Sequence, residues 1–261
     1  MSQVLVAPGV LARDQWPTAF PRLQRLLKPF EDLRSCDKVP LTLLELLLWA
    51  YVTRATSVAS PGCTHMLVYT QSGTNKPVEV SLQLQGFIKK MNVQTFGDWD
   101  RSLGGAGAAL QYLVLTSGAH IVPFKAQCSA LRMLRDCIQR SLGGALIGQF
   151  DGNRICLERR VFRKVVRGLA QQTALTKLDD PEGLAKVVEG EWVVSEKLDI
   201  GYQDATGKVH QCPAALLQEG DFVDVEVSLA IYMRGRRPSS RTAVEVCKLE
   251  NDWNELPPDR L

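Results

Sequence analysis

The clearest alternation of apolar and polar positions in this chain lies at 78–85. The apolar set is Val78, Val80, Leu82 and Leu84, and the polar set is Glu79, Ser81, Gln83 and Gln85. A period of two is typical of a strand with one face buried and one face in water. A Ser72-Gly73 turn precedes this strand, so the pattern predicts a β-hairpin at about 64–90.

Helical spacing dominates the rest of the first 178 residues. The run PLTLLELLLWAYVTR at 40–54 predicts a buried core helix with Pro40 in its first turn, and it is shorter than the roughly 20 apolar residues of a membrane span. Apolar positions three and four apart predict further helices at 123–144, with Gly143 as the stop, and at 157–169. We therefore expect a mainly helical part at 1–178.

The pattern changes after an acidic, turn-rich junction at 178–192. Strand-like segments follow, and a long alternation comes after the Gly220-Asp221 turn: Val223, Val225, Val227, Leu229 and Ile231. These segments predict a β-rich module at 190–251, either a small barrel or a sandwich, and a loose tail at 252–261. The predicted fold class is α+β, with a mainly helical N-terminal part that carries the hairpin and a β-rich C-terminal module.

Composition places the chain among soluble globular proteins, because 45% of its 261 residues are hydrophobic and 23% are charged. The N-terminus has no basic stretch followed by a long apolar core, which predicts that there is no signal peptide. Seven scattered cysteines without a CxxC pair predict reduced thiols in an intracellular protein, cytoplasmic or nuclear. Phosphate-binding GxxxxGK[ST], dinucleotide, HExxH, GxSxG and EF-hand motifs do not occur in the sequence.

The most unusual feature of the sequence is the uneven distribution of charged residues along it. The net charge of +3 combines a segment at 125–167 with ten basic and three acidic residues and a segment at 179–226 with twelve acidic and three basic residues. On the predicted helix at 157–169, four cations fall together opposite the apolar stripe: Arg160, Arg163, Lys164 and Arg167. Such a ribbon could bind a phosphate backbone or an acidic protein, dock on the chain's own acidic segment, or remain solvated.

The turn after the last long strand holds four more arginines: Arg234, Arg236, Arg237 and Arg241. Together with GDFVDVEVSLAIYMR before it and a closing strand after it, this region resembles segments in uncharacterised proteins of mushroom-forming fungi, and that resemblance implies no activity, cofactor or catalytic residue. The turn MRGRRPSSR also resembles the Arg-Gly-Arg-Pro core of the AT-hook, a minor-groove motif, with Arg237 inserted before Pro238. The turn could therefore contact an anion, or its arginines could protect a sheet edge.

Two short pairs offer metal-ligating or nucleophilic side chains, Cys63 with His65 and His210 with Cys212. Residues two apart share a face of a strand, so the pairs could form a zinc site if the fold brought them together. Buried thiols and ordinary histidines explain the same residues, because the spacing is not that of common zinc modules. We expect no metal and no cofactor.

These patterns predict a non-enzymatic, intracellular binding or scaffold protein with no membrane contact. Its partner would be nucleic acid or an acidic protein, bound through the basic helix and the arginine turn. The alternative is an enzyme of unknown class with a pocket between the two parts, using Cys63, His65, His210 or Cys212.

Overall fold

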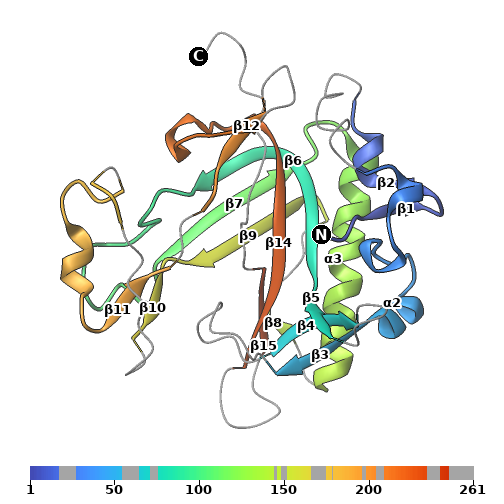
Figure 1. Ribbon diagram of the computed structural model, residues 1–261, viewed down its shortest axis with the longest axis horizontal. Coiled ribbons are helices and arrows are strands. Elements are labelled where there is room, and N and C mark those ends of the chain that lie inside the picture. The colour runs from blue at the N-terminus through green and yellow to red at the C-terminus, as the bar shows by residue number, and fades with distance from the viewer. Residues whose placement is uncertain are drawn as a thin grey trace.

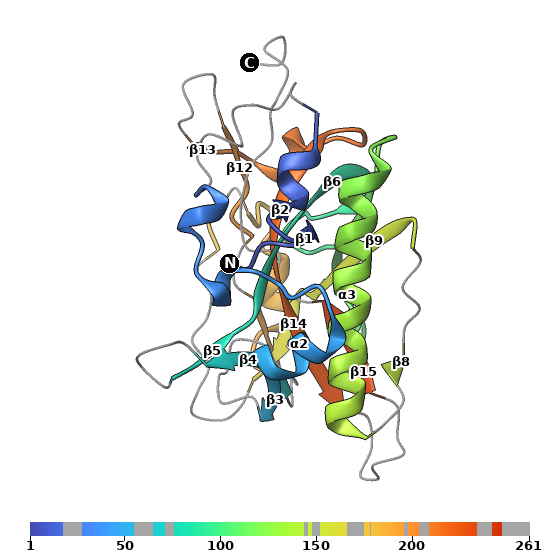
Figure 2. The same ribbon diagram turned by 90° about the vertical axis from the view of Figure 1, so that its right-hand side faces the viewer.

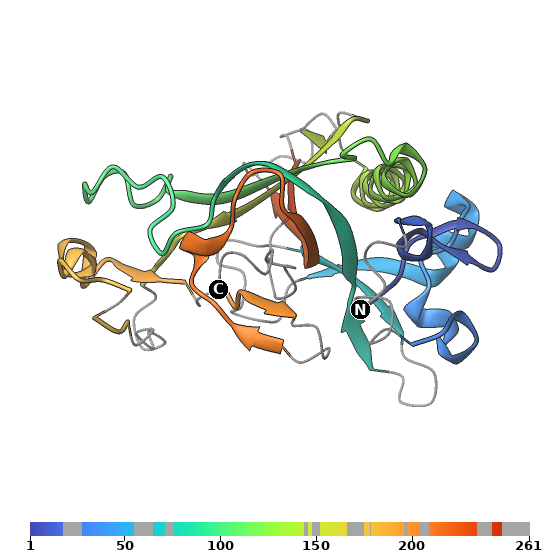
Figure 3. The same cartoon turned by 90° about the horizontal axis from the view of Figure 1, so that it is seen from above.

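A strongly curved, mainly antiparallel sheet organises the chain. The computed structural model describes residues 1–17, 28–54, 65–70, 76–143, 146–147, 152–165, 175–177, 179–195, 198–203, 209–233 and 242–246. Within them the main path of the sheet runs β3 (Ala50–Arg54), β4 (His65–Thr70), β14 (Phe222–Met233), β6 (Ser81–Asn92), β7 (Leu110–Thr116) and β9 (Arg154–Arg160). Figure 3 shows this sheet from above as an arch.

Three short strands extend the sheet. β5 (Pro77–Glu79) pairs with β4, and β15 (Thr242–Val246) pairs with β14. β8 (Leu146–Ile147) runs parallel to β15. The sheet therefore joins strands from both halves of the chain, as Figure 1 shows for the two long central strands β6 and β14.

Two α-helices lie in the part of the chain that the structure describes. α2 (Leu43–Trp49) begins with a capping box, in which Thr42 and Glu45 bind each other's backbone N–H groups. α3 (Ile121–Leu142) ends at Gly143, whose φ of +64° is the left-handed conformation that glycine adopts readily. In Figure 2 both helices and the N-terminal segment lie together along one side of the sheet. Neither helix combines the length and the hydropathy that crossing a bilayer requires.

The N-terminal segment completes the edge of β6 where β7 does not reach. It comprises β1 (Leu5–Ala7), β2 (Val10–Leu11) and the 3₁₀ turn η1 (Ala12–Gln15). The N–H of Ser2 donates to the carbonyl of Ser81 at 2.7 Å, and the N–H of Gln83 donates to the carbonyl of Ser2 at 3.1 Å. Further along, the 3₁₀ turns η2 (Phe30–Asp32) and η3 (Ser35–Asp37) lead toward α2.

A side chain of α3 takes the next position on the same edge. The N–H of Gln85 donates to Gln127 Oε1 at 2.6 Å, and Gln127 Nε2 donates to the carbonyl of Gln85 at 2.8 Å. The Gln127 amide is 2% exposed, so it satisfies both backbone groups of a buried residue as a neighbouring strand would. Beyond Gln85, β7 pairs with the same edge of β6, beginning with Phe87 opposite Thr116.

A smaller apolar cluster lies at the far end of the sheet. It contains Trp99, which lies between β6 and β7, and Val161, which precedes β10. Further members come from β10 (Phe162–Lys164), β11 (Trp192–Val194) and η4 (Leu184–Val188). A separate hairpin, β12 (Gly201–Gln203) with β13 (Val209–Gln211), is followed by η5 (Ala214–Leu216). Figure 3 shows this hairpin beneath the arch.

The predicted fold class, a mainly helical N-terminal part followed by a β-rich C-terminal module, is wrong. Strands prevail within the described part of 1–178, and β14 pairs with β6 and β4 instead of forming a module of its own. The predicted core helix at 40–54 shows the cause. Only the first half is helical; Leu46 is buried, but Leu44 and Leu48 are 71% and 84% exposed, and the run continues as β3. Apolar content alone therefore did not indicate burial. The predicted tail at 252–261 lies outside the residues that the structure describes.

The strand predicted to be half-buried is covered on both faces. Gln83 and Gln85 are 5% and 4% exposed, and the side chain of Gln3 from the N-terminal segment contacts Gln83. Both glutamines donate through Nε2 to Oδ2 of Asp224, which is 3% exposed, and Gln3 donates to Gln83. The alternating pattern predicted that these glutamine side chains would contact water, but in the structure they form hydrogen bonds with protein groups instead.

We expect Gln127→Leu to destabilise the fold by about 2 to 5 kcal/mol, because it leaves the buried N–H and carbonyl of Gln85 without partners. Urea unfolding monitored by circular dichroism measures this change. The matched control is Gln139→Leu, an exposed position on the same helix, which should stay within about 0.5 kcal/mol of wild type. Equal stability of the two variants would contradict the bridging role of the Gln127 amide.

A second prediction concerns Asp37, whose carboxylate accepts two hydrogen bonds of 2.9 Å from Arg34. These bonds lower the pKa of Asp37 against the opposing effect of burial. The carboxylate therefore stabilises the fold above the ordinary carboxyl pKa of about 3.9, and this contribution is lost as the pH falls through the lower folded-state value. Asp37→Asn should reduce the free energy of unfolding near neutral pH, and the difference from wild type should vanish in acid.

The control for Asp37 is Asp32→Asn, an exposed carboxyl in the neighbouring 3₁₀ turn. Urea unfolding of the three proteins between about pH 3 and pH 7 provides the measurement. A difference between Asp37→Asn and wild type that stays constant over this range would show that the ion pair is not its source.

Candidate functional site

The predicted basic helix at 157–169 is wrong, because its first eight residues form the end of β9, a bend and β10. Ile155 and Leu157 are buried while Arg154, Cys156 and Glu158 are exposed, which is the period of a strand. At the bend, Val161 and Phe162 both turn into the smaller apolar cluster. Two adjacent apolar residues after an alternating run imitate helical spacing in the sequence.

The cations predicted to form one ribbon are separated by this bend. Arg160 donates from Nη1 to the carbonyl oxygen of Gly107. Arg163 and Lys164 lie on β10, opposite Val193 and Trp192 of β11. The remaining predicted contacts lie outside the described residues: Arg167, Arg234, Arg236, Arg237 and Arg241.

A different basic surface lies on α3. Lys125, Arg132 and Arg140 are exposed on the side of the helix opposite its buried apolar positions, and we call these three residues the basic face of α3. They are seven and eight residues apart, which places them about 10 and 12 Å apart along the axis at 1.5 Å per residue. Across the described part of the chain, none of the three makes an ion pair, and Asp136 is the one acidic residue on the helix.

The basic face continues toward the sheet. A methyl group placed on Gly152 would lie 3.5 Å from Arg132 Nη2, so the guanidinium approaches the chain just before β9. Arg154, the first residue of β9, is exposed two residues later. Figure 2 shows α3 in front of the sheet, with its length facing the viewer.

The sequence contained the signal for this face. Lys125, Arg132 and Arg140 belong to the basic segment at 125–167, and the helix that carries them was predicted at 123–144. Projecting these cations on the helical period would have placed them opposite the buried Leu134 and Ile138. The predicted ribbon was instead placed on 157–169, where the described residues form strands.

The described members of the cysteine and histidine pairs, His65, His210 and Cys212, do not come together in one site. His65 is on β4 and His210 is on β13, and these strands lie toward opposite ends of the molecule in Figure 2. Cys63 lies outside the described residues, and among those described no group of His, Cys, Asp or Glu is arranged to hold a metal ion. Burial raises the pKa of the Cys212 thiol, which disfavours the thiolate that nucleophilic catalysis needs. Burial, followed by the charge of Arg54, lowers the pKa of His65.

Comparisons with protein-family models, with curated proteins and with solved structures found no match to this chain.

The two thiols Cys156 and Cys212 should differ in reactivity. Cys156 is exposed, whereas Cys212 is partly buried with a raised pKa, so iodoacetamide near pH 7.5 should alkylate Cys156 first. Mass spectrometry of peptides from a time course measures both rates in the folded protein. Labelling in urea is the control, because unfolding should remove the difference. Faster labelling of Cys212 in the folded state would instead indicate an activated thiol.

Proposed function

We propose that this protein is a non-enzymatic binding protein that holds a nucleic-acid backbone against the basic face of α3. The observation that carries the proposal is the row of Lys125, Arg132 and Arg140, exposed and without an ion-pair partner in the described residues. Phosphates are repeated anions, and a row of cations on a rigid helix can neutralise several of them at once.

The composition of the face favours nucleic acid over an acidic protein. Between Lys125 and Arg140 the other outward positions are polar, namely Ser129, Asp136 and Gln139. A protein interface has a desolvated core rich in aromatic and apolar side chains, whereas nucleic-acid interfaces are polar and strongly positive. Contacts with phosphates carry no sequence information, so we expect binding with little dependence on base sequence.

One further observation fits this proposal. The five described cysteines form no disulfide with one another, which supports an intracellular location: Cys36, Cys128, Cys137, Cys156 and Cys212. The arginines of the predicted turn, Arg234, Arg236, Arg237 and Arg241, together with Arg167, would add phosphate contacts to the same partner. We expect Arg160 on β9 and Arg163 and Lys164 on β10 to contribute less to binding, because the bend between the two strands separates them.

The test compares two triple variants that each remove three positive charges. The first changes Lys125, Arg132 and Arg140 to Gln. The second is a control on other elements and changes the exposed residues Lys28, Lys177 and Lys186 to Gln. Fluorescence anisotropy with a labelled duplex of about 20 base pairs and with a single strand, at about 50 and 200 mM salt, measures affinity and salt dependence.

We expect the α3 variant to bind the duplex more weakly and with a shallower salt dependence, by about 0.9 in the log–log slope for each phosphate that is no longer neutralised. The control variant should retain most of the wild-type affinity and slope. Equal weakening in both variants would show that only net charge matters, and an unchanged α3 variant would remove this face from the interface. Poly-glutamate that competes as well as the duplex would favour an acidic protein as the partner.

A further inference from the structure

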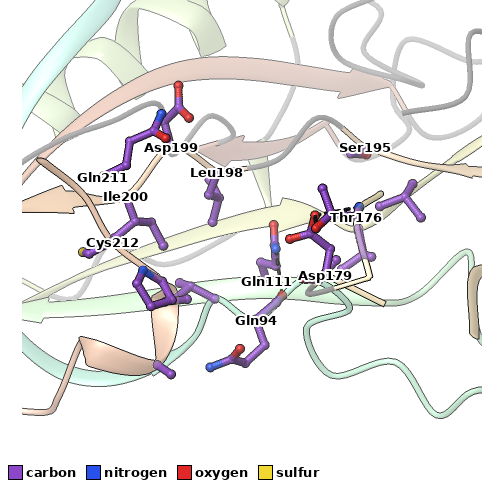
Figure 4. A pocket seen from close by; sticks show the side chains of 17 residues that line it. Gln94, Gln111, Thr176, Asp179, Ser195, Leu198, Asp199, Ile200, Gln211 and Cys212 are labelled. Carbon is purple, nitrogen blue, oxygen red and sulfur yellow. Dashed lines mark hydrogen bonds between the residues drawn. The ribbon is translucent and has the colours of Figure 1, made fainter. Parts of the chain in front are cut away.

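The strongest candidate for a second site is a cavity on the concave side of the sheet. It has a volume of about 590 Å³, within the range of pockets that bind small molecules. Its walls come from the residues just after β6, from β7, from the end of β11 and the residue after it, from the residues just before β12, and from the end of β13 with η5. Figure 4 shows polar side chains from these separate segments around one central space.

Besides Thr176, whose hydroxyl donates to Asp179, five uncharged polar side chains line this pocket: Gln94, Thr95, Gln111, Ser195 and Gln211. Gln111 is the most buried, at 5% exposed, and its Nε2 donates to the carbonyl oxygen of Gln94 at 2.8 Å. Its Oε1 accepts no hydrogen bond from the described residues. The Gln111 amide is therefore fixed through its Nε2 atom, and its Oε1 atom can accept a hydrogen bond from a ligand hydroxyl group.

The other four side chains also have capacity to bind. Within the described part of the chain, the side-chain polar atoms of Gln94, Thr95, Ser195 and Gln211 form no hydrogen bonds. In Figure 4, Gln111 points toward the central space and Gln211 lies on another side of it, whereas the carboxamide of Gln94 extends away from Gln111. The pocket therefore presents amide donors, amide acceptors and hydroxyls from several directions.

The remaining lining residues include an apolar group and a charged group. Val93, Val161, Leu198, Ile200 and Pro213 give an apolar wall. The two charged residues among the described lining are both acidic, Asp179 and Asp199, and Asp179 Oδ2 accepts from the N–H and hydroxyl of Thr176 at 2.9 and 2.7 Å. Among the described lining residues there is no cation that could pair with a phosphorylated or carboxylated ligand.

We infer that this pocket binds an uncharged, polyhydroxylated molecule of the size of a mono- or disaccharide. Each hydroxyl of such a ligand both donates and accepts, which matches carboxamides and hydroxyls on the protein, and its C–H faces can lie on the apolar wall. A purely apolar ligand would bury the Gln111 oxygen without a partner, which costs free energy. The inference is independent of the proposed nucleic-acid contact, because none of the pocket residues lies on α3.

Isothermal titration calorimetry with a defined panel tests the pocket. The neutral probes are glucose, galactose, N-acetylglucosamine, maltose and myo-inositol, and glucose 6-phosphate is the anionic comparison. We expect at least one neutral probe to bind and glucose 6-phosphate to bind more weakly than glucose. Gln111→Met and Gln211→Ala should each weaken the bound probe about five- to tenfold, the effect of removing one hydrogen bond.

Gln218→Ala is the matched control, because Gln218 is an exposed carboxamide seven residues from Gln211 and does not line the pocket. Its affinity for the probe should equal that of wild type. Gln211 is itself exposed, so its variant keeps the test valid even if Gln111→Met perturbs folding. The inference fails if no neutral probe binds with a Kd below about 10 mM, if glucose 6-phosphate binds more tightly than glucose, or if Gln211→Ala binds as wild type does.

Discussion

The buried carboxylate of Asp224 is the constraint on which the arrangement of the chain depends. A charge that is 3% exposed is costly unless hydrogen bonds compensate for the absence of water, and Gln83 and Gln85 supply two of them. Gln3 donates to Gln83, so the same carboxylate ties β14, β6 and the N-terminal segment together. Arg13 is buried nearby; burial lowers its pKa most, and the charges of Asp14 and Asp224 raise it. Any shift of β6 against β14 would break this set of bonds.

The curvature of the sheet separates two surfaces with different chemistry. On one side, α3 buries its apolar positions and directs Lys125, Arg132 and Arg140 outward. On the concave side, the β12–β13 hairpin and the far end of the sheet enclose a pocket with amide, hydroxyl and carboxylate groups. A polyanion and a small neutral ligand could therefore bind the same molecule without competing for residues.

The sequence predicted some elements well and others poorly, for reasons that differ. The helix at 123–144 was confirmed as α3, because its apolar spacing persists over many turns and Gly143 stops it. The helix at 157–169 was wrong, because a bend after Arg160 broke the alternation that begins at Ile155. The pocket could not be predicted, since Gln94, Gln111, Ser195 and Gln211 are far apart along the chain.

By itself the sequence determined local features: the long helix, its glycine stop, the alternation of β14 and the excess of cations between 125 and 167. These depend on neighbours within a few residues, so a periodic pattern carries them. The tertiary structure decided which faces are covered. It buried Gln83, Gln85 and Asp224 and left Leu44 and Leu48 exposed, because burial depends on what packs against a face, and that comes from distant segments.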